Sequence, residues 1–131
     1  MSAPADLNLT GVWTGLYSYA HGLSVTFTAT LLHSGPHLSG QVHEPDTFAG
    51  AGGLLHAAID GRVEDRRVAF TKTYLDLPPE FSGNVRYVGA VSADGLEIDG
   101  TWRLPGHSGR FLMTRNGGVA VAERRRETVK A

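Results

Sequence analysis

Hydrophobic and polar residues alternate with a period of two along most of this chain. In the segment SVTFTATL, Val25, Phe27 and Leu31 share one face, and three threonines occupy the other. The segment LEIDGTWRL alternates in the same way and places Leu96 and Trp102 on its apolar face. This period is typical of a β-strand that buries one face.

Eight such segments follow one another at a spacing of roughly 8–12 residues. The predicted strands cover residues 10–19, 24–32, 38–44, 55–63, 67–75, 85–92, 95–104 and 109–115. A helical period is indicated only at residues 120–131, which predict a short helix or a frayed end. With so little helix to cover a sheet, the pattern favours an all-β fold, an eight-stranded antiparallel up-and-down β-barrel. We expect one barrel domain over residues 8–116 and a C-terminal tail over 117–131.

The connections predicted between the strands distinguish the two ends of the barrel. In an up-and-down order, the short turns HSGPH, EDR and SADG share one end, which we name the floor. The opposite end, which we name the mouth, carries two long segments rich in glycine or proline, residues 45–53 and 76–84. Long loops on a rigid scaffold usually carry function, so we expect the functional site at the mouth.

Composition and charge narrow the classes of function. The net charge of −1 gives no electrostatic reason to expect nucleic acid or an anionic membrane as a partner. Cysteine is absent, which excludes disulfides and thiolate chemistry. His33 and His37 have a metal-like spacing but flank a turn that contains Pro36, so we predict neither a metal nor a cofactor. The chain shows no signal-peptide pattern and no long apolar run, and we expect a cytoplasmic protein.

Several short motifs resemble those of a known group of barrels. LTGVWTG, at the first predicted strand, resembles the G-x-W opening of calycins, which include lipocalins, fatty-acid-binding proteins and avidins. HLSGQVHE, VAFTKTY and IDGTW are similar to strands of the avidin and streptavidin family, so that the resemblance runs over about residues 8–115. It implies that an arginine of the last strand, here Arg115, packs over Trp13 and closes the floor.

The biotin site of the avidins is not matched in this sequence. Gly15 and Tyr19 stand where that family has an asparagine and a small hydroxyl residue, and Val42 and Glu44 stand where it has a tyrosine and a serine. A ureido ring buried without those polar partners would lose its hydrogen bonds. Biotin is therefore not the expected ligand.

Alternation, with Trp13 taken as facing inward, predicts which side chains line the interior. The floor half is apolar, whereas the mouth half is aromatic and polar. We expect Trp13 on the floor and Trp102 nearer the mouth, against Phe70 and Tyr87. The predicted ligand-binding residues of the mouth half are Tyr17, Tyr19, Glu44, Phe70, Lys72, Tyr74, Tyr87 and Trp102.

Glu44 and Lys72 are charged residues on otherwise apolar strand faces, where desolvation opposes a charge. Three explanations are open at this point. The two residues form a structural ion pair, or a break in the strand register leaves both in water, or they have a functional role as an anion-binding or acid–base pair.

Three hypotheses of function follow from these patterns. The first is a non-catalytic barrel that binds a small amphipathic or aromatic molecule. The second is a cofactor-free enzyme of the isomerase or cyclase type, with Glu44, Lys72 and Tyr74 as candidate catalytic residues. The third is a structural barrel that forms a homodimer through an outward-facing apolar stripe. The residues of this stripe are Val12, Leu16, Val88, Ala90 and Leu112.

Overall fold

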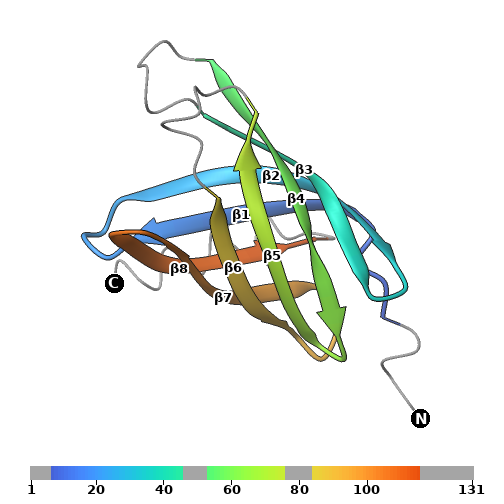
Figure 1. Ribbon diagram of the computed structural model, residues 1–131. Coiled ribbons are helices and arrows are strands. Elements are labelled where there is room, and N and C mark those ends of the chain that lie inside the picture. The colour runs from blue at the N-terminus through green and yellow to red at the C-terminus, as the bar shows by residue number, and fades with distance from the viewer. Residues whose placement is uncertain (1–6, 46–52, 76–83, 116–131) are drawn as a thin grey trace.

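The computed structural model, described for residues 7–45, 53–75 and 84–115, is one closed antiparallel β-barrel (Figure 1). Each strand pairs with the next along the chain, and the first pairs with the last. The predicted eight-stranded up-and-down barrel is therefore confirmed. The strands are β1 (Gly11–Tyr19), β2 (Ser24–Ser34), β3 (His37–Pro45), β4 (Leu54–Glu64), β5 (Arg67–Tyr74), β6 (Val85–Val91), β7 (Glu97–Leu104) and β8 (His107–Thr114).

Helices are absent from the described residues, which accordingly contain no helix able to cross a membrane. The predicted tail, residues 117–131, and the greater part of the two long mouth segments lie outside the described residues. The domain boundary expected near residue 116 therefore stays a prediction.

The seventh predicted strand begins two residues later than its pattern indicated. β7 starts at Glu97 because a tight turn precedes it, in which the Asp94 carboxylate accepts a hydrogen bond from the Leu96 backbone N–H at 3.0 Å. Gly95 adopts a positive φ of 75° in this turn. Leu96, which the alternation placed inside the barrel, lies before the strand and is only half-buried.

Inward-facing glycines let the strands approach one another closely. Gly89 of β6 and Gly100 of β7 are direct partners, and a methyl group built on Gly100 would overlap the carbonyl oxygen of Val88. Such positions permit the sharp bends that a small barrel needs. In Figure 1, β4–β6 lie at a steep angle to β1, β2 and β8.

Trp13 seals the floor of the barrel, as the calycin resemblance implied. Its ring is fully buried, and its indole N–H donates to the carbonyl oxygen of Leu9 at 2.9 Å. The Arg115 guanidinium lies 4.6 Å from the centre of this ring, in a cation–π contact. Arg115 also donates to the carbonyl oxygens of Gly95 and Thr10, so it joins three segments of the chain at the floor.

The predicted apolar stripe lies on the outer wall. Leu16 and Leu112 are direct partners across β1 and β8, and both are half-buried. Between Leu112 and Ala90, however, the register places Asp99. A carboxylate therefore divides the stripe, and the homodimer stays a prediction.

Replacing Trp13 by alanine should lower the free energy of unfolding by about 3–5 kcal/mol, because a large buried ring is lost from the floor. The matched control is Val12→Ala on the same strand, where the side chain is 63% exposed. This change should alter the free energy of unfolding by no more than about 0.5 kcal/mol. Urea denaturation of both variants measures the difference, and similar values would contradict the account of the floor.

Candidate functional site

A buried ion pair spans the mouth half of the interior. The Lys72 ammonium of β5 lies 3.0 Å from a carboxylate oxygen of Glu44 on β3, across the intervening strand β4. Glu44 is 1% exposed and Lys72 is 2% exposed. Both point inward because they share a strand face with Val42 and Phe70, which are core residues. The register break that would have left both charges in water is therefore wrong.

Tyrosines complete the surroundings of this pair. The phenol groups of Tyr17 and Tyr74 donate to the second carboxylate oxygen of Glu44, at 2.7 and 2.9 Å. The Lys72 ammonium lies 4.6 Å from the ring centre of Tyr17, 4.8 Å from that of Tyr74 and 5.4 Å from that of Tyr87. Glu44 thus accepts three hydrogen bonds, and the lysine cation is enclosed by three aromatic rings.

Burial shifts the ionisation of this cluster. It raises the pKa of Tyr17, Tyr74 and Tyr87 above the usual value for a phenol, and the negative Glu44 carboxylate adds to the effect. Burial lowers the pKa of Lys72, while attraction to Glu44 acts in the opposite direction. The three phenols therefore stay protonated, and those of Tyr17 and Tyr74 donate to the carboxylate. Glu44, Lys72, Tyr17 and Tyr74 thus supply hydrogen-bond partners to one another inside the barrel.

The buried aromatic rings form two groups. The Phe70 ring stacks on Tyr87 with ring centres 4.8 Å apart. Trp102 lies beside Tyr87 in the strand register, but its ring meets Tyr17 at 5.9 Å and Tyr19 at 4.9 Å. The expectation that the Trp102 ring lies against Phe70 and Tyr87 is therefore corrected: its ring contacts are with Tyr17 and Tyr19.

The absence of a side chain on a neighbouring strand explains the orientation of Trp102. A methyl group built on Gly109 of β8 would lie 2.7 Å from the indole nitrogen. The bare backbone leaves room for the ring to turn toward β1. There its N–H donates to the carbonyl oxygen of Ser18 at 3.0 Å.

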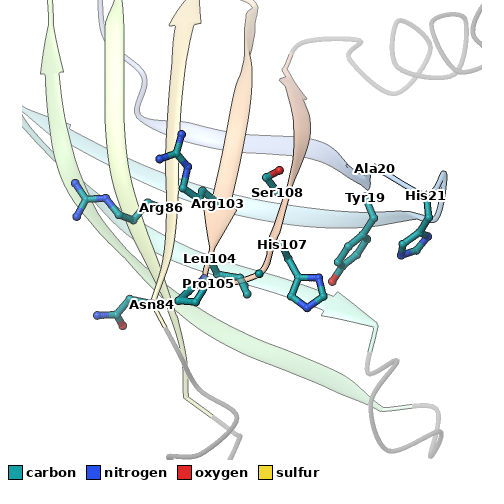
Figure 2. Close-up of a pocket in the computed structure, with 11 residues that line it drawn as sticks. Tyr19, Ala20, His21, Asn84, Arg86, Arg103, Leu104, Pro105, His107 and Ser108 are labelled. Atoms are coloured by element: carbon teal, nitrogen blue, oxygen red, sulfur yellow. The ribbon is translucent and has the colours of Figure 1, made fainter.

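A cavity of about 700 Å³ lies at the rim of the mouth, beside the turn between β7 and β8 (Figure 2). Tyr19 is the only predicted ligand-binding residue among its described lining. The Tyr19 ring stacks on His21 with centres 5.2 Å apart and meets His107 edge-on at 6.3 Å. The described residues of this rim cavity are Tyr19, Ala20, His21, Asn84, Arg86, Arg103, Leu104, Pro105, Gly106, His107 and Ser108.

The structure thus separates the eight predicted residues into two levels. Tyr19 and Tyr74 are half-buried near the mouth, and the other six are buried below them. Sequence reasoning missed Arg86, Arg103 and the two rim histidines, because alternation and turn position assigned them to solvent. The one available signal was the presence of two arginines near the mouth ends of adjacent predicted strands.

Comparison with known proteins identifies the architecture. No protein-family profile and no curated protein matches the chain. Among solved structures, a redesigned β-barrel superposes with a TM-score of 0.71 at 13% identity, and the match covers 88% of this chain and 97% of that barrel. A de novo designed fluorescence-activating β-barrel superposes with a TM-score of 0.62 at 12% identity, and the match covers 88% of this chain and 100% of that barrel. The barrel EF1p2_mFAP2b, bound to DFHBI, superposes with a TM-score of 0.60 at 15% identity, and the match covers 88% of this chain and 99% of that barrel. At these identities the likeness shows the fold alone.

Replacing Glu44 by glutamine should lower the free energy of unfolding by about 3 kcal/mol or more, because the Lys72 cation loses its buried counter-charge. Glu64→Gln, at an exposed position on β4, is the matched control and should have little effect. The double variant Glu44→Gln/Lys72→Met should recover part of the loss, which a double-mutant cycle in urea measures. Equal stabilities of Glu44→Gln and Glu64→Gln would contradict a stabilising pair.

Stability should fall as the pH rises above about 10, where tyrosines of an unfolded chain ionise. The folded barrel raises the pKa of all four tyrosines, so it retains protons that the unfolded chain releases. The stabilisation is therefore complete below that pH and is lost above it. Ultraviolet absorbance should show tyrosinate forming together with loss of circular dichroism. Ionisation of all four phenols in a barrel that stays folded would disagree with this account.

Proposed function

We propose that this protein binds a small molecule in the rim cavity, with Tyr19 as the principal aromatic contact. The observation that carries the proposal is the cavity itself, whose volume of about 700 Å³ lies within the usual range for small-molecule sites. Its lining combines an aromatic ring, apolar groups from Leu104 and Pro105, and several polar side chains. That combination suits an amphipathic or aromatic ligand.

The buried cluster beneath the rim supports this site. Tyr19 packs on Trp102 and Tyr17, and Tyr17 in turn donates to the carboxylate of Glu44. A ligand ring placed on Tyr19 would therefore meet a surface held in position before binding, which limits the entropy lost on association. In this proposal the other predicted residues hold Tyr19 and Trp102 in place.

The similar designed barrels are consistent with such a role. One is described as fluorescence-activating, and another is bound to DFHBI. A barrel of this architecture can therefore hold a small molecule. The contact of Arg115 with Trp13 further supports kinship with the calycins, which we include in the proposal.

Acid–base catalysis is a second candidate function, because Lys72 and Tyr74 both donate hydrogen bonds to the Glu44 carboxylate. Such convergence is the geometry that proton transfer needs. Each of the three polar groups already has a partner inside the barrel, however, and a substrate would have to displace one of them. Binding at the rim requires no such exchange and is the preferred function.

Fluorine NMR of protein labelled with fluorotryptophan tests the binding proposal. Naphthyl and biphenyl carboxamides should shift the Trp102 resonance saturably, because Trp102 lies directly beneath Tyr19. The Trp13 resonance should stay in place, since that ring is buried at the floor. Tyr19→Ala should weaken binding about tenfold, equivalent to about 1.4 kcal/mol. Leu32→Ala, on the outer wall of β2, should leave affinity unchanged.

Two results would contradict binding at the rim. One is the absence of any saturable Trp102 shift with the whole set of carboxamides. The other is an equal shift of both tryptophan resonances, which would indicate a general effect on the barrel.

A further inference from the structure

The described lining of the rim cavity is basic, although the chain has a net charge of −1. It contains Arg86, Arg103, His21 and His107. Asn84 and the hydroxyl of Ser108 add further hydrogen-bond donors. No carboxylate is found among these described lining residues, so the local field favours a negatively charged group.

The two arginines stand in an unfavourable arrangement on the barrel wall. Arg86 of β6 and Arg103 of β7 are direct partners in the strand register, and both are exposed. Like charges placed directly opposite one another destabilise a sheet. Their neighbours in the same row are Thr71 on β5 and Ser108 on β8, which are uncharged.

Neither arginine has a counter-charge within the described residues. The ion pairs found there join Lys72 to Glu44 and His37 to Asp60, and neither involves the rim. Each guanidinium presents a fork of N–H donors that matches the oxygens of a carboxylate or a phosphate. An oxyanion bound between the two arginines would relieve their repulsion.

We propose that the rim cavity selects ligands that carry an oxyanion, held by Arg86 and Arg103, together with an aromatic group that packs on Tyr19. This inference rests on the proposed function and specifies the chemistry of the same cavity. Figure 2 shows the arginines on one side of the β7–β8 turn and Tyr19 with His21 on the other. Leu104 and Pro105 lie between these two groups, so the site suits a ligand with its charge at one end.

Matched pairs of ligands test this selectivity. Naphthoate and naphthyl phosphate should each bind at least about tenfold more tightly than naphthamide, which has a similar shape without the charge. The variant Arg86→Gln/Arg103→Gln should remove this advantage, so that the three compounds bind it with similar affinity. Arg110→Gln is the control, because Arg110 is exposed on the outer face of β8 and does not line the cavity. The control variant should still bind the two anions more tightly than naphthamide. Whichever of naphthoate and naphthyl phosphate binds more tightly identifies the preferred oxyanion.

The result that overturns the inference is equal binding of naphthoate, naphthyl phosphate and naphthamide, or an advantage of the anions that survives in the double arginine variant. Failure of the proposed function is distinguishable, since then no naphthyl compound would shift the Trp102 resonance. In that case titration with inorganic phosphate tests the anion site separately. Saturable shifts of arginine side-chain nitrogen signals that are lost in the double variant would support an anion site at Arg86 and Arg103, and the absence of such shifts would overturn it.

Discussion

The hydrogen-bonded pairing of β1 with β8 is the interaction on which the rest of the structure depends. It joins Thr14–Tyr19 to Gly109–Thr114 and closes the sheet on itself, so that no strand of the barrel remains an exposed edge. Closure brings together residues that are far apart along the chain. The Trp102 indole reaches the Ser18 carbonyl, and His107 comes to lie beside Tyr19. Both the packing of Trp102 on Tyr17 and Tyr19 and the rim cavity depend on the meeting of these two strands.

The charged residues inside the barrel are paired, whereas those at the rim are not paired among the described residues. Inside, Glu44 and Lys72 neutralise each other, and tyrosine hydroxyls and rings surround them. Buried charges are tolerated only when they are satisfied in this way. At the rim, Arg86 and Arg103 oppose each other without a counter-charge among the described residues. The charges without a counter-charge among the described residues therefore lie at the entrance, above an interior whose two charged groups are paired.

Alternation in the sequence was sufficient to predict the barrel and the direction of its side chains. Period-two patterns placed Glu44, Lys72 and Trp102 inside, and all three are buried. The scarcity of helical patterns, together with eight consecutive strands, was sufficient to predict closure. The prediction was wrong for Leu96, because the turn hydrogen bond to Asp94 delays the start of β7. The alternation of hydrophobic and polar residues does not predict the geometry of such a turn.

The sequence by itself determined the eight strands, the inward set of side chains and the presence of two charges within that set. Only the tertiary structure decided which of these side chains meet. Lys72 and Tyr74 of β5 and Tyr17 of β1 all reach the Glu44 carboxylate on β3, although no two of these three strands are neighbours. The opposition of Arg86 and Arg103 follows from the register of β6 and β7. The physical reason is that distances across a barrel depend on strand tilt and stagger, which are properties of the closed sheet as a whole.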